Sequence, residues 1–182
     1  MKALNTYIIK VFCLTVLVTL LSSFIDNRNN QNIDTNAKMK SYFIYGFTKN
    51  IEWPQGYKEG NFIIGILGNS NLSTELNTMA STYKAGSQSF EIKKFSSTSS
   101  IEKCHMLIIS PDQPGDFQEI LNKIKNSSTL LITEKAGLAK QGSIINFVVQ
   151  NNKQGFELNR SIAEKYDLKV SSSLSTLAVN VY

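Results

Sequence analysis

The sequence has few residues of the types from which most catalytic and metal sites are built. One histidine and two cysteines occur among 182 residues. Zinc sites and nucleophile–base pairs depend on these residue types, so the composition speaks against an enzyme and against a metal centre. Two cysteines also exclude a fold held by several disulfides. The sequence has neither a P-loop nor a dinucleotide-binding fingerprint, and we expect no cofactor.

Charge is sparse as well. Charged residues make up 18% of the chain and hydrophobic residues 42%, which excludes a disordered chain. The net charge is +5. However, the basic residues are scattered, with no Lys/Arg-rich stretch and no RNA-binding motif, so we expect no nucleic-acid partner.

The N-terminus has the pattern of a secretory signal peptide. Lys2 and Lys10 precede an uncharged apolar run over residues 11–21, and Ser22 and Ser23 follow. The run is shorter than the about 20 apolar residues of a membrane-spanning helix, so a cleaved signal is favoured over a retained anchor. We expect residues 1–23 to be the signal peptide, 24–37 a flexible Asn-rich lead, and 38–182 a single exported domain.

Only one cysteine, Cys104, remains once the signal peptide is removed. It cannot form an internal disulfide, so it is either buried and inert or available for pairing between chains. The apolar run that follows it, residues 106–109, favours burial.

The rest of the chain predicts an α/β fold. Apolar runs at residues 62–67, 105–110 and 129–133 alternate with helical patterns, which predicts parallel strands joined by helices. A hairpin pattern over 143–158 then adds antiparallel strands. We expect one three-layer-like domain with a mixed sheet flanked by helices, parallel in its first half.

Some local expectations are more specific. A helix is predicted over residues 38–52, with Met39, Phe43, Phe47 and Ile51 recurring every four residues and Tyr42 on the same side. Asn159 is expected to cap a helix. A last helix is expected to bury Leu174, Leu177, Ala178 and Val181. Asn146 interrupts an apolar strand and is expected to face solvent or a neighbouring loop.

Several segments together resemble the YfiR-like family. They cover nearly the whole chain after the signal, in order and at fitting spacings: residues 42–54 (YFIYGFTKNIEWP), 62–68, 104–110, 142–147, 156–159 and 170–174. The resemblance implies a periplasmic α/β domain without known catalytic chemistry. Its best understood relatives restrain a membrane-bound diguanylate cyclase by binding the periplasmic part of that enzyme.

The resemblance therefore implies a regulator in cyclic di-GMP signalling, with a membrane signalling protein such as a diguanylate cyclase or a sensor kinase as partner. It also implies a homodimer, because such relatives are dimers. Disulfides make some of them sensitive to redox state. Cys104 matches a family cysteine, but no second cysteine is left to pair with it, so that internal switch is not available here.

Two groups of residues are candidates for binding. Tyr42, Tyr45, Trp53 and Pro54 belong to an aromatic-rich element with more aromatic side chains than one buried face needs. They predict either a partner surface, where Tyr and Trp are enriched, or plain core packing.

The second group follows the apolar strands. Gly68, Asn69, Ser70 and Asp112 lie in loops that share the carboxyl edge of a parallel sheet, where ligands bind in open α/β folds. The alternative function is therefore a module for a small ligand or an anion, and the plainer interpretation of residues 68–70 is a tight turn. Cys104 and His105 are not expected to form a catalytic pair, because neighbours in a strand point to opposite faces.

Overall fold

The computed structural model describes residues 27–111 and 117–182. The expected signal peptide and Asp112 therefore lie outside the described residues. The chain from Ala37 to Tyr182 forms one compact unit. Helix α2 (Asn27–Asn50) begins ahead of this unit, within the segment for which the composition predicts a flexible lead. None of the described helices is both long and apolar enough to cross a membrane.

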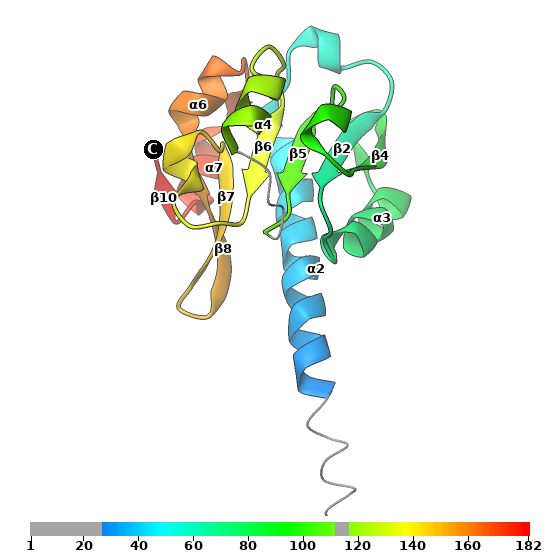
Figure 1. Ribbon diagram of the computed structural model, residues 1–182, viewed down its shortest axis with the longest axis vertical. Coiled ribbons are helices and arrows are strands. Elements are labelled where there is room, and N and C mark those ends of the chain that lie inside the picture. Colours follow the sequence, from blue (N-terminus) through cyan, green and yellow to red (C-terminus); the bar gives the residue numbers. More distant parts are fainter. Residues whose placement is uncertain (1–26, 112–116) are drawn as a thin grey trace, which may run out of the picture. The chain divides into compact units, whose positions relative to one another are not determined.

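An eight-stranded mixed sheet organises the unit (Figure 1). Its strand order is β10-β8-β7-β6-β5-β2-β4-β3. The five strands from β7 to β4 in this order are parallel, whereas β8 runs antiparallel to β7 and β3 antiparallel to β4. The bounds are β2 (Phe62–Leu67), β3 (Lys84–Ala85), β4 (Gln88–Phe95), β5 (Met106–Ile109), β6 (Leu130–Thr133), β7 (Ile145–Gln150), β8 (Lys153–Leu158) and β10 (Asn180–Val181). The expected α/β class with a mixed sheet is confirmed.

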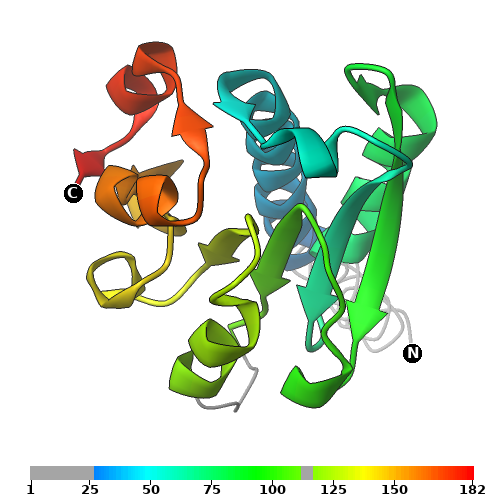
Figure 2. The same cartoon turned by 90° about the horizontal axis from the view of Figure 1, so that it is seen from above.

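Helices cover both faces of the sheet. Figure 2 shows α2 on one side and α4 on the other. The bounds are α3 (Leu72–Thr82), α4 (Phe117–Ile124), α5 (Leu138–Gln141), α6 (Arg160–Lys165) and α7 (Ser172–Leu177). Because both faces are covered, the central strands are almost continuously buried and apolar, as their sequences predict.

Alternation along each strand divides the interior into two clusters. Ile64 and Ile66 of β2 point toward the cluster that contains α2 and α3, and Leu67 points toward the cluster that contains α4. At Gly65 the ring of Phe95 lies so close that an added Cβ would come within 2.5 Å of it. A glycine is therefore required for Phe95 to pack against β2.

Helix α2 ends two residues earlier than predicted. Ile51 and Glu52 form strand β1 (Ile51–Glu52), which pairs antiparallel with β9 (Lys169–Val170). Ser171 reinforces this junction, since its N–H donates to the carbonyl of Asn50 at 2.9 Å and its hydroxyl donates to Asn50 Oδ1 at 2.9 Å. The pairing partner is far along the chain, so the helical pattern gave no sign of it.

The predicted last helix is also shorter than expected. It ends at Leu177, whose side chain is 65% exposed, and Val181 lies in β10 instead. Only Leu174 of the predicted apolar face is buried. The prediction for Asn159 is confirmed, because its side chain accepts the N–H of Ile162 at the start of α6.

Asn146 is fully buried, so the expectation that it faces solvent is wrong. Its Oδ1 accepts the hydroxyl of Thr133 at 2.8 Å, and its Nδ2 donates to Glu157 Oε2 at 3.0 Å. Burial tends to raise the pKa of Glu157, but hydrogen bonds from Asn146, Tyr182 and Asn180 outweigh it and lower that pKa. A buried asparagine is stable here because polar groups of the two neighbouring strands, β6 and β8, satisfy it.

Candidate functional site

An exposed apolar groove runs between α2 and α7. We call it the α2–α7 groove. Its volume is about 290 Å³, and its walls are Met39, Tyr42, Phe43, Gly46, Phe47 and Asn50 of α2, Phe156 of β8, and Leu174 and Leu177 of α7. Tyr42 is 52% exposed and Met39 41% exposed. With Leu177, which is 65% exposed, three large side chains of this groove thus face solvent over much of their surface.

Aromatic rings form the floor of the α2–α7 groove. Phe47 and Phe156 meet edge to face with their ring centroids 5.1 Å apart, and Phe43 lies 5.5 Å from Phe156. Gly46 leaves the wall open, because an added Cβ would have no heavy atom within 4 Å. The floor is thereby formed by packed rings, and the wall at Gly46 leaves free space beside them.

The buried face of α2 differs from the predicted one. Ala37, Ser41, Ile44 and Phe47 are buried, whereas Met39 and Tyr42 point outward. The apolar arc of the helix is wider than the surface that the sheet covers, and the uncovered part of the arc becomes a wall of the groove.

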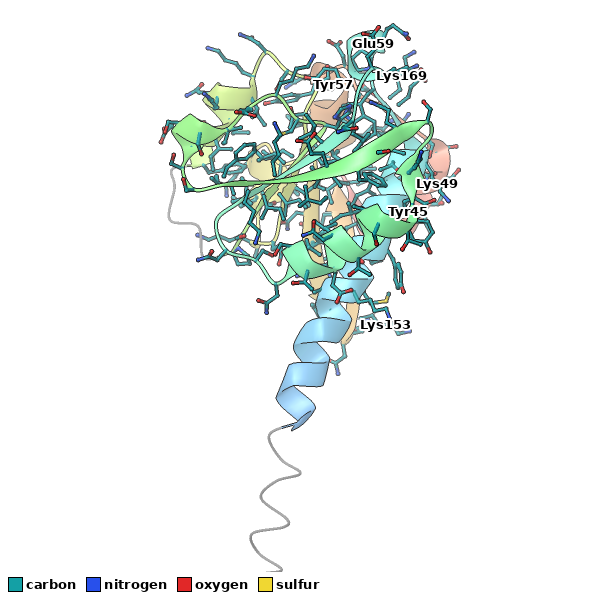
Figure 3. All side chains as sticks on the ribbon, turned by 90° about the vertical axis from the view of Figure 1, so that its right-hand side faces the viewer. Tyr45, Lys49, Tyr57, Glu59, Lys153 and Lys169 are labelled. Atoms are coloured by element: carbon teal, nitrogen blue, oxygen red, sulfur yellow. The ribbon has the colours of Figure 1, made fainter. Side chains whose placement is uncertain are left out.

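A basic and aromatic flank borders the groove. Tyr45 stacks on Tyr83 with centroids 4.5 Å apart, and the Lys49 ammonium lies 4.3 Å from the Tyr45 ring (Figure 3). Every charged side chain of α2 between Ala37 and Asn50 is a lysine. Lys40 is paired with Glu134, which leaves the charges of Lys38 and Lys49 open on this side.

Trp53 and Pro54 lie away from the α2–α7 groove. Trp53 is only 6% exposed, packs edge to face on Phe62 at 5.0 Å, and donates its indole N–H to the carbonyl of His105 at 3.1 Å. Pro54 precedes a 3-10 turn, Gln55–Tyr57. Of the four residues predicted for partner contact, Tyr42 lines the groove and Tyr45 lies on the same helix against Tyr83. Trp53 is in the core, and Pro54 borders a different cleft.

A second, polar cleft of about 640 Å³ lies between β1–β9 and α6. Trp53 and Pro54 belong to its lining, but charged residues dominate it. Exposed pairs such as Lys58–Glu52 and Arg160–Glu164 balance these charges within the lining. Such exposed pairs are weak.

Cys104 and His105 lie on opposite faces of the sheet, as predicted. Burial raises the pKa of the Cys104 thiol to about 12, which leaves it unreactive at neutral pH. The His105 ring is held from both sides: the N–H of Ile63 donates to Nδ1 at 3.0 Å, and Nε2 lies 2.7 Å from the Tyr57 carbonyl, to which it donates. Burial lowers the pKa of His105, so the imidazole is neutral.

Two of the predicted ligand-binding residues at the carboxyl edge of the sheet form the turn that leads into α3. Gly68 adopts φ +88° and Ser70 Oγ accepts the N–H of Leu72 at 3.2 Å, so both take part in the turn into α3. Asn69 lies between them. Further along the same edge, Ser110 and Thr133 line a small pocket of about 90 Å³.

Among residues 27–111 and 117–182, no three His, Cys, Asp or Glu side chains lie close enough together to hold a metal ion. The groove residues that the sequence did not single out as a binding surface are Met39 and Leu177. The excess of aromatic side chains near residue 42 was the available signal for the groove. The sequence gave no signal that Leu177 would be exposed, because its spacing fits a buried helix face.

Comparison with known proteins gives a fold neighbour and a family. A comparison with curated proteins finds no match. Among solved structures, the ABC domain in complex with L-Trp from Streptococcus pneumonia is 14% identical with a TM-score of 0.50, which shows likeness of fold alone. The match covers 66% of this chain and about half, 55%, of that chain.

The YfiR/HmsC-like family matches residues 37–179, which is most of the chain and nearly all of the compact unit. The proteins of this family are in general periplasmic regulators of diguanylate cyclase. The chain belongs to the YfiR/HmsC-like family.

Proposed function

We propose that this protein is a non-enzymatic periplasmic regulator that binds a membrane signalling protein, such as a diguanylate cyclase or a sensor kinase, through the α2–α7 groove. The observation that carries the proposal is the exposure of Met39, Tyr42 and Leu177 around one open apolar groove, in a chain whose family regulates cyclases. A contiguous exposed apolar surface of this kind marks an interaction site.

The charges beside the groove define the partner segment. Lys38 and Lys49 flank the wall formed by α2, while α7 contributes only Ser, Thr and Leu side chains. The complementary segment therefore has an apolar ridge that enters the groove and acidic residues that face α2. Tyr42 and Tyr45 supply aromatic contact area next to those lysines, which suits a binding surface.

Photo-crosslinking tests this proposal in cells. A benzophenone amino acid replaces Tyr42 in one strain and Lys125, an exposed residue at the end of α4, in the control strain. We expect an adduct with a membrane signalling protein at position 42 and none at position 125, and mass spectrometry identifies the partner. An adduct with a second copy of this chain would instead assign the groove to a homodimer.

A pair of matched substitutions tests the energetics. Leu177→Ser removes an exposed groove residue, and Val149→Ser removes an equally exposed apolar residue, 63% accessible, in the β7–β8 hairpin. Burying a leucine contributes about 1.5–3 kcal/mol, so Leu177→Ser is expected to weaken binding at least about tenfold. Leu177→Ser should also change the cellular level of cyclic di-GMP relative to the wild type, whereas Val149→Ser should leave both binding and that level unchanged. Equal effects of the two variants would contradict the proposal.

Export is a separate part of the proposal. The resemblance and the N-terminal pattern together support cleavage after the apolar run, with residues 1–23 removed. N-terminal sequencing of the protein from a periplasmic extract should give a chain that starts near residue 24. Recovery of the chain with Met1 in the membrane fraction would show a retained anchor instead.

A further inference from the structure

Strand β4 leaves most of its outer side without a pairing partner. Its inner side pairs with β2 from Phe90 to Phe95, whereas on the outer side the short strand β3 reaches only Gln88 and Ser89. In the part of the chain that the structure describes, no other strand pairs with β4, the long green arrow that crosses the front of Figure 3. We call the open side of residues 90–95 the β4 edge. Such an edge is a template on which another chain can add a strand.

The pairing with β2 determines which backbone groups of β4 point outward. The carbonyl of Phe95 accepts the N–H of Gly68 at 3.2 Å, so Phe95 bonds toward β2. Backbone bonding alternates between the two sides of a strand, so every second residue counted from Phe95 bonds inward and the residues between them bond outward. The outward residues are Phe90, Ile92 and Lys94. They present three N–H and three C=O groups along the β4 edge.

The charges of β4 are arranged symmetrically around Ile92. Glu91 precedes it and Lys93 follows it, and these two side chains share the face of the strand opposite to that of Ile92. Both are accessible, since the side chain of Glu91 is 41% exposed and that of Lys93 33% exposed. In an antiparallel pair that places Ile92 of one copy opposite Ile92 of another, Glu91 of each copy lies opposite Lys93 of the other.

The neighbouring registers place like charges opposite each other. Outward residues must face outward residues for the backbone bonds to form, so the register can shift only in steps of two residues. One such shift sets Lys93 opposite Lys93, and the other sets Glu91 opposite Glu91. Like charges directly opposite destabilise a strand pair, so charge selects the register centred on Ile92. Lysines on an edge normally discourage pairing, and a second copy carries the acidic residue at the matching position.

We propose that two copies of this chain pair antiparallel along the β4 edge, with Ile92 opposite Ile92 on a two-fold axis. Ile92 exchanges two backbone hydrogen bonds with its counterpart, and Phe90 of each copy exchanges two with Lys94 of the other. The dimer thereby joins two eight-stranded sheets into one.

The backbone bonds supply most of the affinity, and the charges supply the register. Lys93 already contacts Glu102 at 2.8 Å, and Glu91 accepts the side-chain N–H of Asn61 at 3.1 Å, so the new ion pairs are exposed and weak. Four strands separate β4 from β8 in the sheet, so the α2–α7 groove of each copy stays free. The proposal does not depend on that groove or on a membrane partner.

Sedimentation velocity over a dilution series of the full chain tests this dimer. The wild type should sediment as a mixture of one chain and two, with a ratio that depends on concentration. Glu91→Lys sets a lysine opposite Lys93 of the other copy, and Lys93→Glu sets a glutamate opposite Glu91. Because two attractive pairs become repulsive, each variant should raise the dissociation constant of the dimer at least about fivefold.

Three further samples separate pairing from net charge. The double variant Glu91→Lys/Lys93→Glu exchanges the two charges and should associate as the wild type does. An equimolar mixture of the two single variants should associate as well. Lys94→Glu changes the net charge as Lys93→Glu does, but residue 94 faces Phe90 of the other copy, so it should leave the dissociation constant nearly unchanged. Urea unfolding checks that each variant is folded.

Disulfide formation measures the register directly. Glu91→Cys and Lys93→Cys, carrying tags of different size, are mixed under mild oxidation, with the buried Cys104 as background. The disulfide between the two variants should dominate, because residue 91 lies opposite residue 93 and only diagonal to residue 91 of the other copy. The proposal is overturned if the wild type is monomeric up to about 1 mM. It is equally overturned if the charge reversals leave the dimer unchanged, or if neither the double variant nor the mixture restores association.

Discussion

Replacing Trp53 with alanine separates the two roles that the sequence allowed for this residue. The side chain is 6% exposed, packs on Phe62, and donates to the His105 carbonyl. Truncating a buried tryptophan costs about 3–5 kcal/mol, and the carbonyl that loses its donor adds about 1 kcal/mol. The total is about 4–6 kcal/mol, which for a unit of about 150 residues lowers the melting temperature by about 13–20 °C.

Urea unfolding followed by far-ultraviolet circular dichroism measures this loss, since Trp53 is the only tryptophan and its fluorescence is absent from the variant. Trp53→Phe keeps most of the ring contact but removes the N–H, so it should cost about 1–2 kcal/mol. A loss below about 1 kcal/mol for Trp53→Ala would refute a core role. Reduced partner binding with unchanged stability would then favour the interface.

Three further perturbations test particular contacts. Gly65→Ala should destabilise the protein by about 1–3 kcal/mol in urea unfolding, because its Cβ would collide with the Phe95 ring; a neutral result would show that the ring moves aside. Burial lowers the pKa of His105, the only histidine, so its contribution to stability is complete above the ordinary pKa of 6.5. As the pH falls below 6.5, the unfolded chain binds a proton before the folded protein does, so the free energy of unfolding should fall. His105→Gln should flatten this pH dependence between pH 7.5 and about 5. A wild-type profile that is already flat would contradict the buried neutral ring. Cys104, with its pKa raised to about 12, should react with a thiol reagent at pH 8 only after denaturant is added, and rapid labelling of the native protein would disprove its burial.

The sequence predicted the parts of the fold that depend on local pattern. The apolar runs that became β2, β5 and β6 were identified, because strands covered on both faces are continuously apolar. The hairpin of β7 and β8 and the cap at Asn159 depend on neighbouring residues, and both were predicted. Burial of Cys104 followed from the strand beside it.

The features that were missed depend on residues far apart in the chain. Ile51 leaves the helix because Val170 offers a strand to pair with. Asn146 is buried because Thr133 and Glu157 satisfy it from two other strands. A pattern along one segment carries no record of such partners, and for the same reason it could not show which side of α2 the sheet leaves uncovered.

Of the two walls of the α2–α7 groove, the sequence pointed only to the one formed by α2. The surplus of aromatic side chains on one helix pointed to an accessible Tyr42, which is half exposed. The opposite wall of the groove could not be foreseen, because Leu177 has the spacing of a core residue and becomes exposed when the chain leaves the helix after it.

The α2–α7 groove joins the first helix of the unit to the last one. The two walls come from segments far apart in the chain, and the hydrogen bond between Ser171 and Asn50, 121 residues apart, links the elements that carry them. A fragment of the unit without α7 keeps only the wall formed by α2 and the floor at Phe156. A ligand that fills this groove therefore contacts both ends of the folded unit at once.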